Sequence, residues 1–244
     1  AFVNCENLAN ITIPNGIQNI AYAAFNGCKS LNYTTYNNGK YLGNETNPYL
    51  VFCGVVDTTI TDFTIPDGTK IIFDSAFKNC SNLTNLTIPN SVISVGYSAF
   101  SGCSMLTYTT YNNGKYLGNT TNPYLVLVAV ADKTITDFTI PNSTQIIVPS
   151  AFNGCTALTS ITIPGSVTSI GYNMFYNCSS LTSIIIPNSV VSIDMGAFYN
   201  CKNLVSITIP NSVLFLSPTA ISNCANFSTI FYGGTEIEWY NIGI

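Results

Sequence analysis

Nine cysteines are the residues of this chain best suited to chemistry, and eight of them recur at one position. Cysteines in such number could form disulfides, hold zinc or supply a nucleophile. No Cys-x-x-Cys pair and no histidine accompanies them, so we expect no metal site. The pattern is clearest in Ala151-Phe152-x-x-Cys155, and the eight are Cys5, Cys28, Cys80, Cys103, Cys155, Cys178, Cys201 and Cys224.

The eleven acidic residues are the other candidates for catalysis. No nucleophile elbow, phosphate loop or calcium-binding loop surrounds them. Asp62 and Asp137 face the same side but lie three repeats apart, about 14 Å at roughly 4.8 Å per repeat. That separation exceeds the one between paired glycosidase carboxylates. We therefore expect no enzyme activity, no catalytic residue and no cofactor.

The composition excludes two further classes of protein. The chain is 47% hydrophobic and 7% charged, its seven basic residues are all lysine, and its net charge is −4. Nucleic-acid binding depends mainly on cationic contacts to phosphate, so we expect none. The longest apolar run, about 124–131, is far shorter than the roughly 20 residues of a membrane-spanning helix, so we expect no membrane insertion within this chain.

Internal repetition explains the low charge. Proline ends an Ile-x-Ile-Pro tetrad, or a variant of it, at intervals of 23 or 52 residues. Because 52 equals 23 plus 29, each long interval hides a second, longer unit. About ten repeats then cover the chain, which we expect to be a single domain over 1–244 and, since it opens inside a repeat, a fragment of a longer protein. The repeats start at Leu8, Leu31, Ile60, Leu83, Leu106, Ile135, Leu158, Leu181, Leu204 and Phe227.

Each repeat predicts one coil of a solenoid. In 181–187 the apolar fourth and sixth positions alternate with polar ones, which is typical of a half-buried strand, and Pro187 ends that strand. Val190 and Ile193 turn inward from an opposite wall, and an Ala-Phe pair fills the space between the walls. Stacked coils bury these faces together. The cysteines then form a column of parallel side chains, which favours buried, reduced thiols.

This motif resembles the leucine-rich repeats, whose L-x-x-L-x-L core is matched by Leu158-x-x-Ile161-x-Ile163. The A-F-x-x-C-x-x-L-x-x-I-x-I-P run resembles more specifically the 23-residue BspA-like class of bacterial and some protozoan surface proteins. The resemblance implies a leucine-rich repeat solenoid of the α/β horseshoe class, strand-dominated with little helix, and a parallel concave β-sheet. It also implies secretion or cell-surface display, and adhesion to proteins of host or microbial surfaces or the extracellular matrix. We expect a monomer.

Two long units are near-duplicates of each other. Residues 31–66 and 106–141 lie 75 positions apart and match at 29 of 36 positions. Strand-like segments on either side of a turn-rich stretch predict inserted β-hairpins near 37–56 and 112–131. These hairpins either broaden the solenoid and cover its side, or act as binding appendages, because insertions in repeat proteins often map to the binding face.

The third and fifth positions of each repeat point outward. Threonine fills eight of ten fifth positions, as in a ladder that stabilises a sheet. The third positions read Asn, Tyr, Asp twice in the N-terminal half, whereas the C-terminal repeats carry small hydroxyl residues. Tyrosine is favoured in interfaces. The candidate ligand-binding residues are Tyr33, Asp62, Asn85, Tyr108 and Asp137, with Tyr41 and Tyr116 on the hairpins.

Residues 233–241 break the repeat pattern. Thr235 is a suitable N-cap, and Glu236 and Glu238 follow in the first turn of a predicted short helix. Trp239 then takes the place of the repeat phenylalanine as a core or cap residue.

Three functions remain open from the sequence. The leading one is a non-enzymatic recognition or adhesion module that binds protein or surface ligands through its concave face and hairpins. The second is a structural stalk or spacer that positions another domain. The third is binding of ice or another crystal surface by the threonine column.

Overall fold

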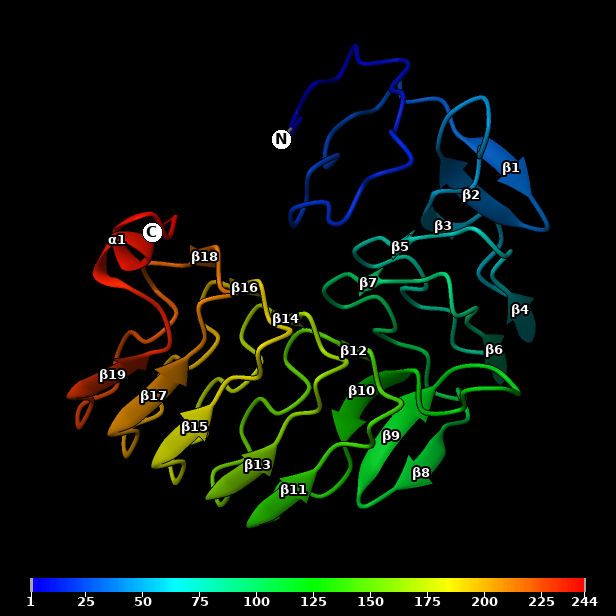
Figure 1. Ribbon diagram of the computed structural model, residues 1–244. Coiled ribbons are helices and arrows are strands. Elements are labelled where there is room, and N and C mark those ends of the chain that lie inside the picture. The colour runs from blue at the N-terminus through cyan, green and yellow to red at the C-terminus, as the bar shows by residue number, and fades with distance from the viewer. Residues whose placement is uncertain (1, 244) are drawn as a thin grey trace. The chain divides into compact units, whose positions relative to one another are not determined.

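The computed structural model describes residues 2–243, which group into two compact units. Unit 1 runs to Tyr108 and also includes Gly118–Asn122, and unit 2 comprises Thr109–Leu117 and the residues from Pro123 onward. Both units consist of short strands and turns, and the described residues contain a single α-helix (Figure 1). The single-domain organisation over 1–244 stays a prediction.

One wall of each unit, here called the ladder wall, is built from the Ile-x-Ile segments. Its strands pair in parallel with strict register, so that each repeat position lies opposite the same position of the next coil. This confirms the strand-dominated solenoid with parallel pairing (Figure 1). The strands are β4 (Asp62–Thr64) with β6 (Asn85–Thr87) in unit 1, and β11 (Asp137–Thr139) with β13 (Ser160–Thr162) and β15 (Ser183–Ile185) with β17 (Ser206–Ile209) and β19 (Thr229–Tyr232) in unit 2.

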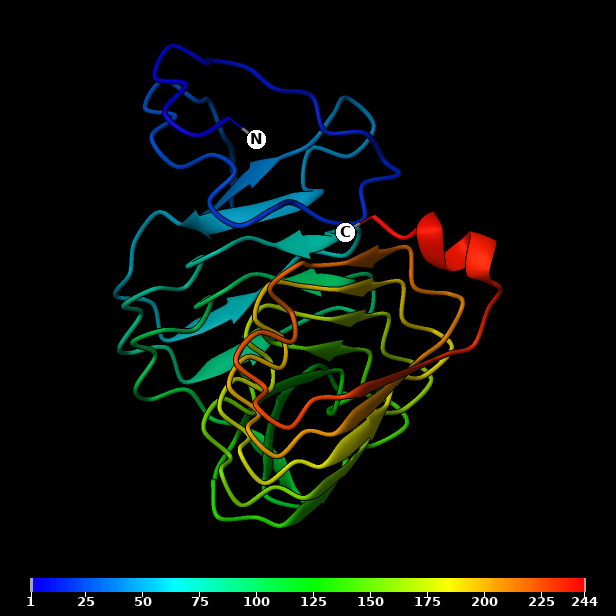
Figure 2. The ribbon, with the colours of Figure 1, turned by 90° about the vertical axis from the view of Figure 1, so that its left-hand side faces the viewer.

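A second wall of two-residue strands faces the ladder wall within each unit. Proline makes the turn between them: it has no N–H to give to the ladder, and its carbonyl accepts from the N–H three residues on, as Pro187 does from Val190 at 3.0 Å. Figure 2 shows the coils of unit 2 stacked one on another. The second-wall strands are β5 (Ile71–Ile72), β7 (Ser94–Val95), β12 (Ile146–Ile147), β14 (Ser169–Ile170), β16 (Ser192–Ile193) and β18 (Phe215–Leu216).

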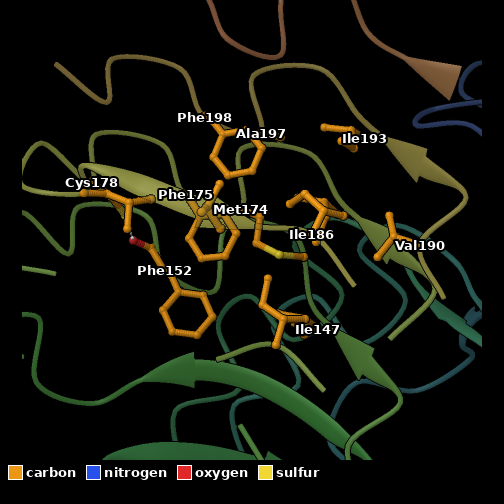
Figure 3. Packing of buried hydrophobic residues seen from close by; sticks show 14 of the residues in the cluster. Ile147, Phe152, Met174, Phe175, Cys178, Ile186, Val190, Ile193, Ala197 and Phe198 are labelled. Carbon is orange, nitrogen blue, oxygen red and sulfur yellow. Dashed lines mark hydrogen bonds between the residues drawn. The ribbon is translucent and has the colours of Figure 1, made fainter. Parts of the chain in front are cut away.

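Columns of identical residue types fill the space between the walls. In unit 2 the rings of Phe152, Phe175 and Phe198 stack at centroid distances of 5.2 and 5.4 Å (Figure 3). All three are fully buried. Burying such a side chain contributes about 1.5–3 kcal/mol, so a coil gains most of its stability from the coils above and below it.

The cysteine column is reduced. All nine cysteines are free, and the five central ones, Cys80, Cys103, Cys155, Cys178 and Cys201, are buried, as predicted. The Sγ–H groups of Cys103, Cys178 and Cys201 donate along the stack to phenylalanine carbonyls of the preceding coil. The distance from Cys178 to the Phe152 carbonyl is 3.2 Å (Figure 3). Burial raises the pKa of Cys178 to about 12 and that of Cys103 to about 11. Their thiols are therefore neutral at neutral pH and poor nucleophiles.

Two left-handed residues flank each Ala-Phe pair and set the bend of the coil. In unit 1, Ser75 and Asn79 have φ of 57° and 64°, and in unit 2 Ser150 and Gly154 have φ of 68° and 76°. Asparagine and glycine tolerate this region best, which explains why the position before the repeat cysteine is Asn or Gly in most repeats.

Each long unit adds three antiparallel strands to this plan. β2 pairs with β3 at Leu42 opposite Val51, and β3 continues in parallel with β5 of the second wall. The same arrangement recurs in unit 2, where β10 pairs with both β9 and β12. The added strands are β1 (Thr34–Tyr36), β2 (Gly39–Leu42) and β3 (Val51–Val55), and β8 (Thr109–Tyr111), β9 (Gly114–Leu117) and β10 (Val126–Val130).

The pairing of β1 with β2 changes the threonine column. A two-residue turn at Asn37 and Asn38, with φ of 44° and 64°, reverses the chain, so Thr35 lies opposite Lys40. The parallel ladder resumes at Gly43, whose carbonyl accepts from the Ile13 N–H at 2.9 Å. Thr35 and its counterpart Thr110, which pairs with Lys115, are therefore outside the column in which the sequence pattern placed them.

The C-terminal helix α1 (Glu236–Tyr240) begins as predicted. Thr235 is its N-cap and forms a capping box with Glu238. The Trp239 ring packs edge-on against Tyr232 at 5.2 Å. Among residues 2–243 no helix has the length and apolar character needed to cross a membrane.

Candidate functional site

Asp62 and Asn85 form the best-defined polar feature on the ladder wall of unit 1. They lie opposite each other on β4 and β6, and the Asn85 amide donates to the Asp62 carboxylate at 2.7 Å. Thr61 Oγ1 donates to the other carboxylate oxygen, also at 2.7 Å. The hydrogen bonds from Thr61 and Asn85 lower the pKa of Asp62. The wall therefore presents an exposed, ionised carboxylate held in one orientation.

Like Tyr36 of β1, Tyr33 is an exposed aromatic residue of the first long unit. It is 37% exposed and directly precedes β1, which pairs with β2 and not with β4. It therefore does not continue the ladder that joins Asp62 and Asn85. Partial burial, with the neighbouring Cys53 and Cys28, raises the pKa of Tyr33. Its hydroxyl is neutral at physiological pH and can donate a hydrogen bond.

Two hollows meet at Tyr33. The first, here called the lysine hollow, has a volume of about 280 Å³ and the second, here called the loop hollow, about 380 Å³. Both are open to solvent, and both use residues of the first long unit. Tyr33, Lys40, Cys53, Gly54, Val55, Thr58, Ser75, Ala76 and Lys78 line the lysine hollow. Asn10, Ile11, Asn32, Tyr33, Thr34, Tyr41, Leu42, Gly43, Asn44, Glu45 and Pro48 line the loop hollow.

Tyr41 and Tyr116 lie in the core, in contrast to the binding role expected from their hairpins. Each is fully buried, and each ring lies beneath a glycine two residues earlier. A Cβ at Gly39 would lie 2.5 Å from the Tyr41 hydroxyl. The β2–β3 pair forms part of the second wall, so its inward face packs against the core instead of projecting. We leave both tyrosines out of the proposed binding surface.

Tyr108 and Asp137 complete the candidate set. Tyr108 is half-buried, and burial together with Cys103 raises its pKa. Asp137 belongs to unit 2, where it is exposed on β11 opposite Ser160 and accepts from Thr136 Oγ1 at 3.1 Å. Asp137 thus lacks the amide neighbour that Asp62 has. The structure brings Asp62 and Asn85 together directly, and the role of the whole set in binding stays a prediction.

Sequence reasoning missed the two lysines of the first hollow. Lys40 lies on β2, and Lys78 follows the Ala-Phe pair of the next coil, so 38 positions separate them in the chain. A signal was present: the two long units differ at positions 53, 54 and 58, and all three line this hollow.

Metal binding has no support in the described part of the chain. Within residues 2–243 no three cysteine or carboxylate side chains gather in a way that could hold a metal ion. Asp57, at the edge of the first long unit, instead accepts hydrogen bonds from the N–H and Oγ1 of Thr59.

Comparison with known proteins identifies the family. The family described as the BspA type leucine-rich repeat region matches in six copies over residues 48–121 and 129–240. Because the match covers well over half of the sequence, the chain belongs to the BspA-type leucine-rich repeat family. No curated protein sequence matches the chain.

One solved structure supports the same fold. A leucine rich cell surface protein from Faecalibacterium prausnitzii is 24% identical, with a TM-score of 0.51 over 100% of this chain and 78% of that one. A leucine-rich repeat protein from T. pallidum is also 24% identical and covers 82% of both chains, with a TM-score of 0.40. The first of these likenesses extends the leucine-rich repeat fold over the full length of this chain.

Proposed function

We propose that this protein is a non-enzymatic recognition module, secreted or displayed at a cell surface, which binds a protein of a host or microbial surface or of the extracellular matrix. Its contact surface is the exposed ladder wall of unit 1 around Asp62 and Asn85, with Tyr33 beside the two hollows. Family membership supports the general role, and the chemistry of this wall supports the location.

The Asp62–Asn85 pair is the main support for the proposal, because the equivalent positions of other repeats show what the ladder itself requires. In unit 2 the same ladder position is Asp137, Ser160, Ser183, Ser206 and Thr229, and the two serines Ser183 and Ser206 pair in parallel with the same register. A charged residue and an amide are thus not needed to build the wall. An ionised carboxylate fixed by two hydrogen bonds offers a partner a preorganised acceptor at little entropic cost.

The test replaces this pair with the residues that unit 2 uses. An Asp62→Ser/Asn85→Ser variant, alone and combined with Tyr33→Ala, is compared with the wild-type chain for binding to purified extracellular-matrix proteins by surface plasmon resonance. We expect the affinity for a bound partner to fall by at least about tenfold, as for residues at the centre of an interface. Ser183→Ala serves as the control and leaves binding unchanged. A partner that binds all variants equally places the contact elsewhere.

A structural spacer is the second candidate, and one observation favours it. The hairpin strands β2 and β3 are largely buried and extend the second wall, so they add to the core of the solenoid instead of forming projecting arms. If no matrix or surface protein binds the chain, the recognition proposal fails and the spacer role is preferred.

A further inference from the structure

The lysine hollow has the chemistry of a small binding site in its own right. We propose that it binds one carboxylate-bearing sugar, of the size of a hexuronic acid, with the carboxylate at Lys40 and Lys78 and the ring against Tyr33. This inference rests on the proposed recognition function and names the ligand chemistry of one part of that surface.

The charge of the hollow is the first argument. The chain is acidic overall and has seven lysines, yet two of them line one hollow of about 280 Å³. Neither Lys40 nor Lys78 has a carboxylate within salt-bridge distance among residues 2–243, where the ion pair is Lys29 with Glu6. The carboxylate of Asp57, which is next to Thr58 in the sequence, accepts hydrogen bonds from the N–H and the Oγ1 of Thr59. Two ammonium groups without an anionic partner favour an anion from outside the chain.

The lining of the hollow distinguishes an acidic sugar from a simple anion. Tyr33 offers a partly exposed aromatic ring, which can pack against the C–H face of a sugar while its hydroxyl bonds a ring substituent. Thr58 and Ser75 add hydroxyl groups that both donate and accept hydrogen bonds. The volume lies just below the range of about 300–1,000 Å³ typical of small-molecule sites, so it suits a single sugar residue bound weakly.

The second copy of the duplicated block provides an independent argument. Three of the seven differences between the copies fall on this hollow, where Cys53, Gly54 and Thr58 correspond to Val128, Ala129 and Lys133. Lys78 corresponds to Asn153, and in unit 2 the Lys133 ammonium donates to the Asn153 carbonyl. The second copy thus carries larger side chains at two positions and a lysine whose ammonium already has a hydrogen-bond acceptor within the chain. Such concentrated divergence is expected where one copy acquired a site.

Ligand-observed and protein-observed NMR test the proposal with four probes: D-glucuronate, D-glucose, acetate and inorganic phosphate. We expect glucuronate to bind in the millimolar range, to shift the amide signals of residues 53–58 and 75–78, and to bind at least about tenfold more tightly than glucose or acetate. Lys40→Gln/Lys78→Gln abolishes this binding. Lys202→Gln, which removes a charge in unit 2, leaves it unchanged.

A copy-exchange variant gives the sharpest control. Cys53→Val/Gly54→Ala/Thr58→Lys/Lys78→Asn places the residues of the second copy in the first. We expect it to lose glucuronate binding, because Lys78 is absent and the lysine introduced at position 58 donates to the carbonyl of position 78, as Lys133 does to Asn153. Its thermal midpoint should fall, since Gly54 has a φ of 152° that other residues rarely adopt. If this variant fails to fold, the lysine variants decide the question. Equal binding of glucose and glucuronate, equal binding of phosphate and glucuronate, or unchanged binding by Lys40→Gln/Lys78→Gln overturns the proposal.

The same measurements separate this inference from the proposed function. If Asp62→Ser/Asn85→Ser abolishes protein binding while glucuronate does not bind the wild type, the acidic-sugar site fails and the recognition surface stands. Alternatively, glucuronate shifts the signals of residues 53–58 and 75–78 while no substitution in the ladder wall changes the affinity for the protein partner. In that case the ladder wall is not the protein-binding surface, and the sugar site stands.

Discussion

The two long units differ little in sequence, and their differences lie mainly at the surface. Both copies form the same three antiparallel strands, with a turn whose asparagines have φ of 44° and 64° in one and 44° and 66° in the other. Both bury the equivalent tyrosine completely. Of the seven positions that differ, five line the hollows of the first copy: Asn32, Glu45, Cys53, Gly54 and Thr58.

This comparison separates the parts of the insertion that build the fold from those free to diverge. The strands, the turn and the buried ring are the same because each copy must complete a coil and cover its neighbours. Asn32, Glu45 and Thr58 are exposed at the rims of the hollows and are not held by packing, so substitutions there change surface chemistry at little cost in stability.

The shared buried tyrosine gives the largest expected effect. Tyr41→Ala and Tyr116→Ala should each reduce the free energy of unfolding by about 3–5 kcal/mol, because each removes a fully buried ring packed between other aromatic rings. Urea denaturation followed by circular dichroism measures it. Tyr41→Phe is the control and should be neutral or slightly stabilising, since the hydroxyl has no hydrogen-bond partner. A cost below 1 kcal/mol for either alanine variant would contradict the core placement.

Cys53 in the first copy corresponds to Val128 in the second, and this difference should make the contribution of the first copy to the free energy of unfolding depend on pH. Burial raises the pKa of Cys53 from 9.0 to about 12. As the pH rises, the unfolded chain loses this proton first, so the stabilising contribution is complete below about pH 9 and is lost up to about pH 12. Cys53→Val should make the fall in unfolding free energy shallower by about 1.4 kcal/mol per pH unit in this window.

The reciprocal substitution checks that result. Val128→Cys should steepen the alkaline loss of stability if its thiol is similarly enclosed. Urea midpoints measured at intervals from pH 8.5 to 11 give both slopes. Identical slopes for the wild type and Cys53→Val would show that the Cys53 thiol is not shielded from water in the folded state.

Replacing either of two equivalent buried threonines should have a smaller effect, and a stabilising one. Thr69 and Thr144, 75 positions apart, are fully buried, and their hydroxyls have no partner. Other coils carry valine there, as at Val92 and Val190. Thr69→Val and Thr144→Val should each raise the free energy of unfolding by about 1 kcal/mol. Val92→Thr should lower it by a similar amount, and a destabilised Thr69→Val would point to a buried water bound by the hydroxyl.

The neighbours of the two ladder aspartates give the smallest effect. Asn85→Ser gives Asp62 the type of neighbour that Asp137 has in Ser160. Because the amide stabilises the ionised carboxylate, its loss should raise the pKa of Asp62. Thr61→Ala should raise it further, since Thr61 makes the larger contribution. Carboxylate NMR titration reads both changes, and an unshifted titration in Asn85→Ser would show that the hydrogen bond is absent in solution.

The sequence by itself determined the features that repeat. Alternating apolar residues, the proline after them and the Ala-Phe pair each report a local conformation, and the fixed spacing requires that identical residues stack. The ladder register, the two walls, the reduced cysteine column and the Thr235 N-cap could all be predicted for that reason.

The tertiary structure decided what the insertions do. Tyr33 and Tyr41 sit in similar polar surroundings in the sequence, yet one is partly exposed and the other fully buried, because the turn at Asn37 and Asn38 sends β2 back against the core. The same reversal moves Thr35 out of the ladder and puts Gly43 in its place. The lysine hollow exists because stacking brings Lys78 of one coil to Lys40 of the coil before it, a proximity that depends on three-dimensional closure and leaves no local periodic signal.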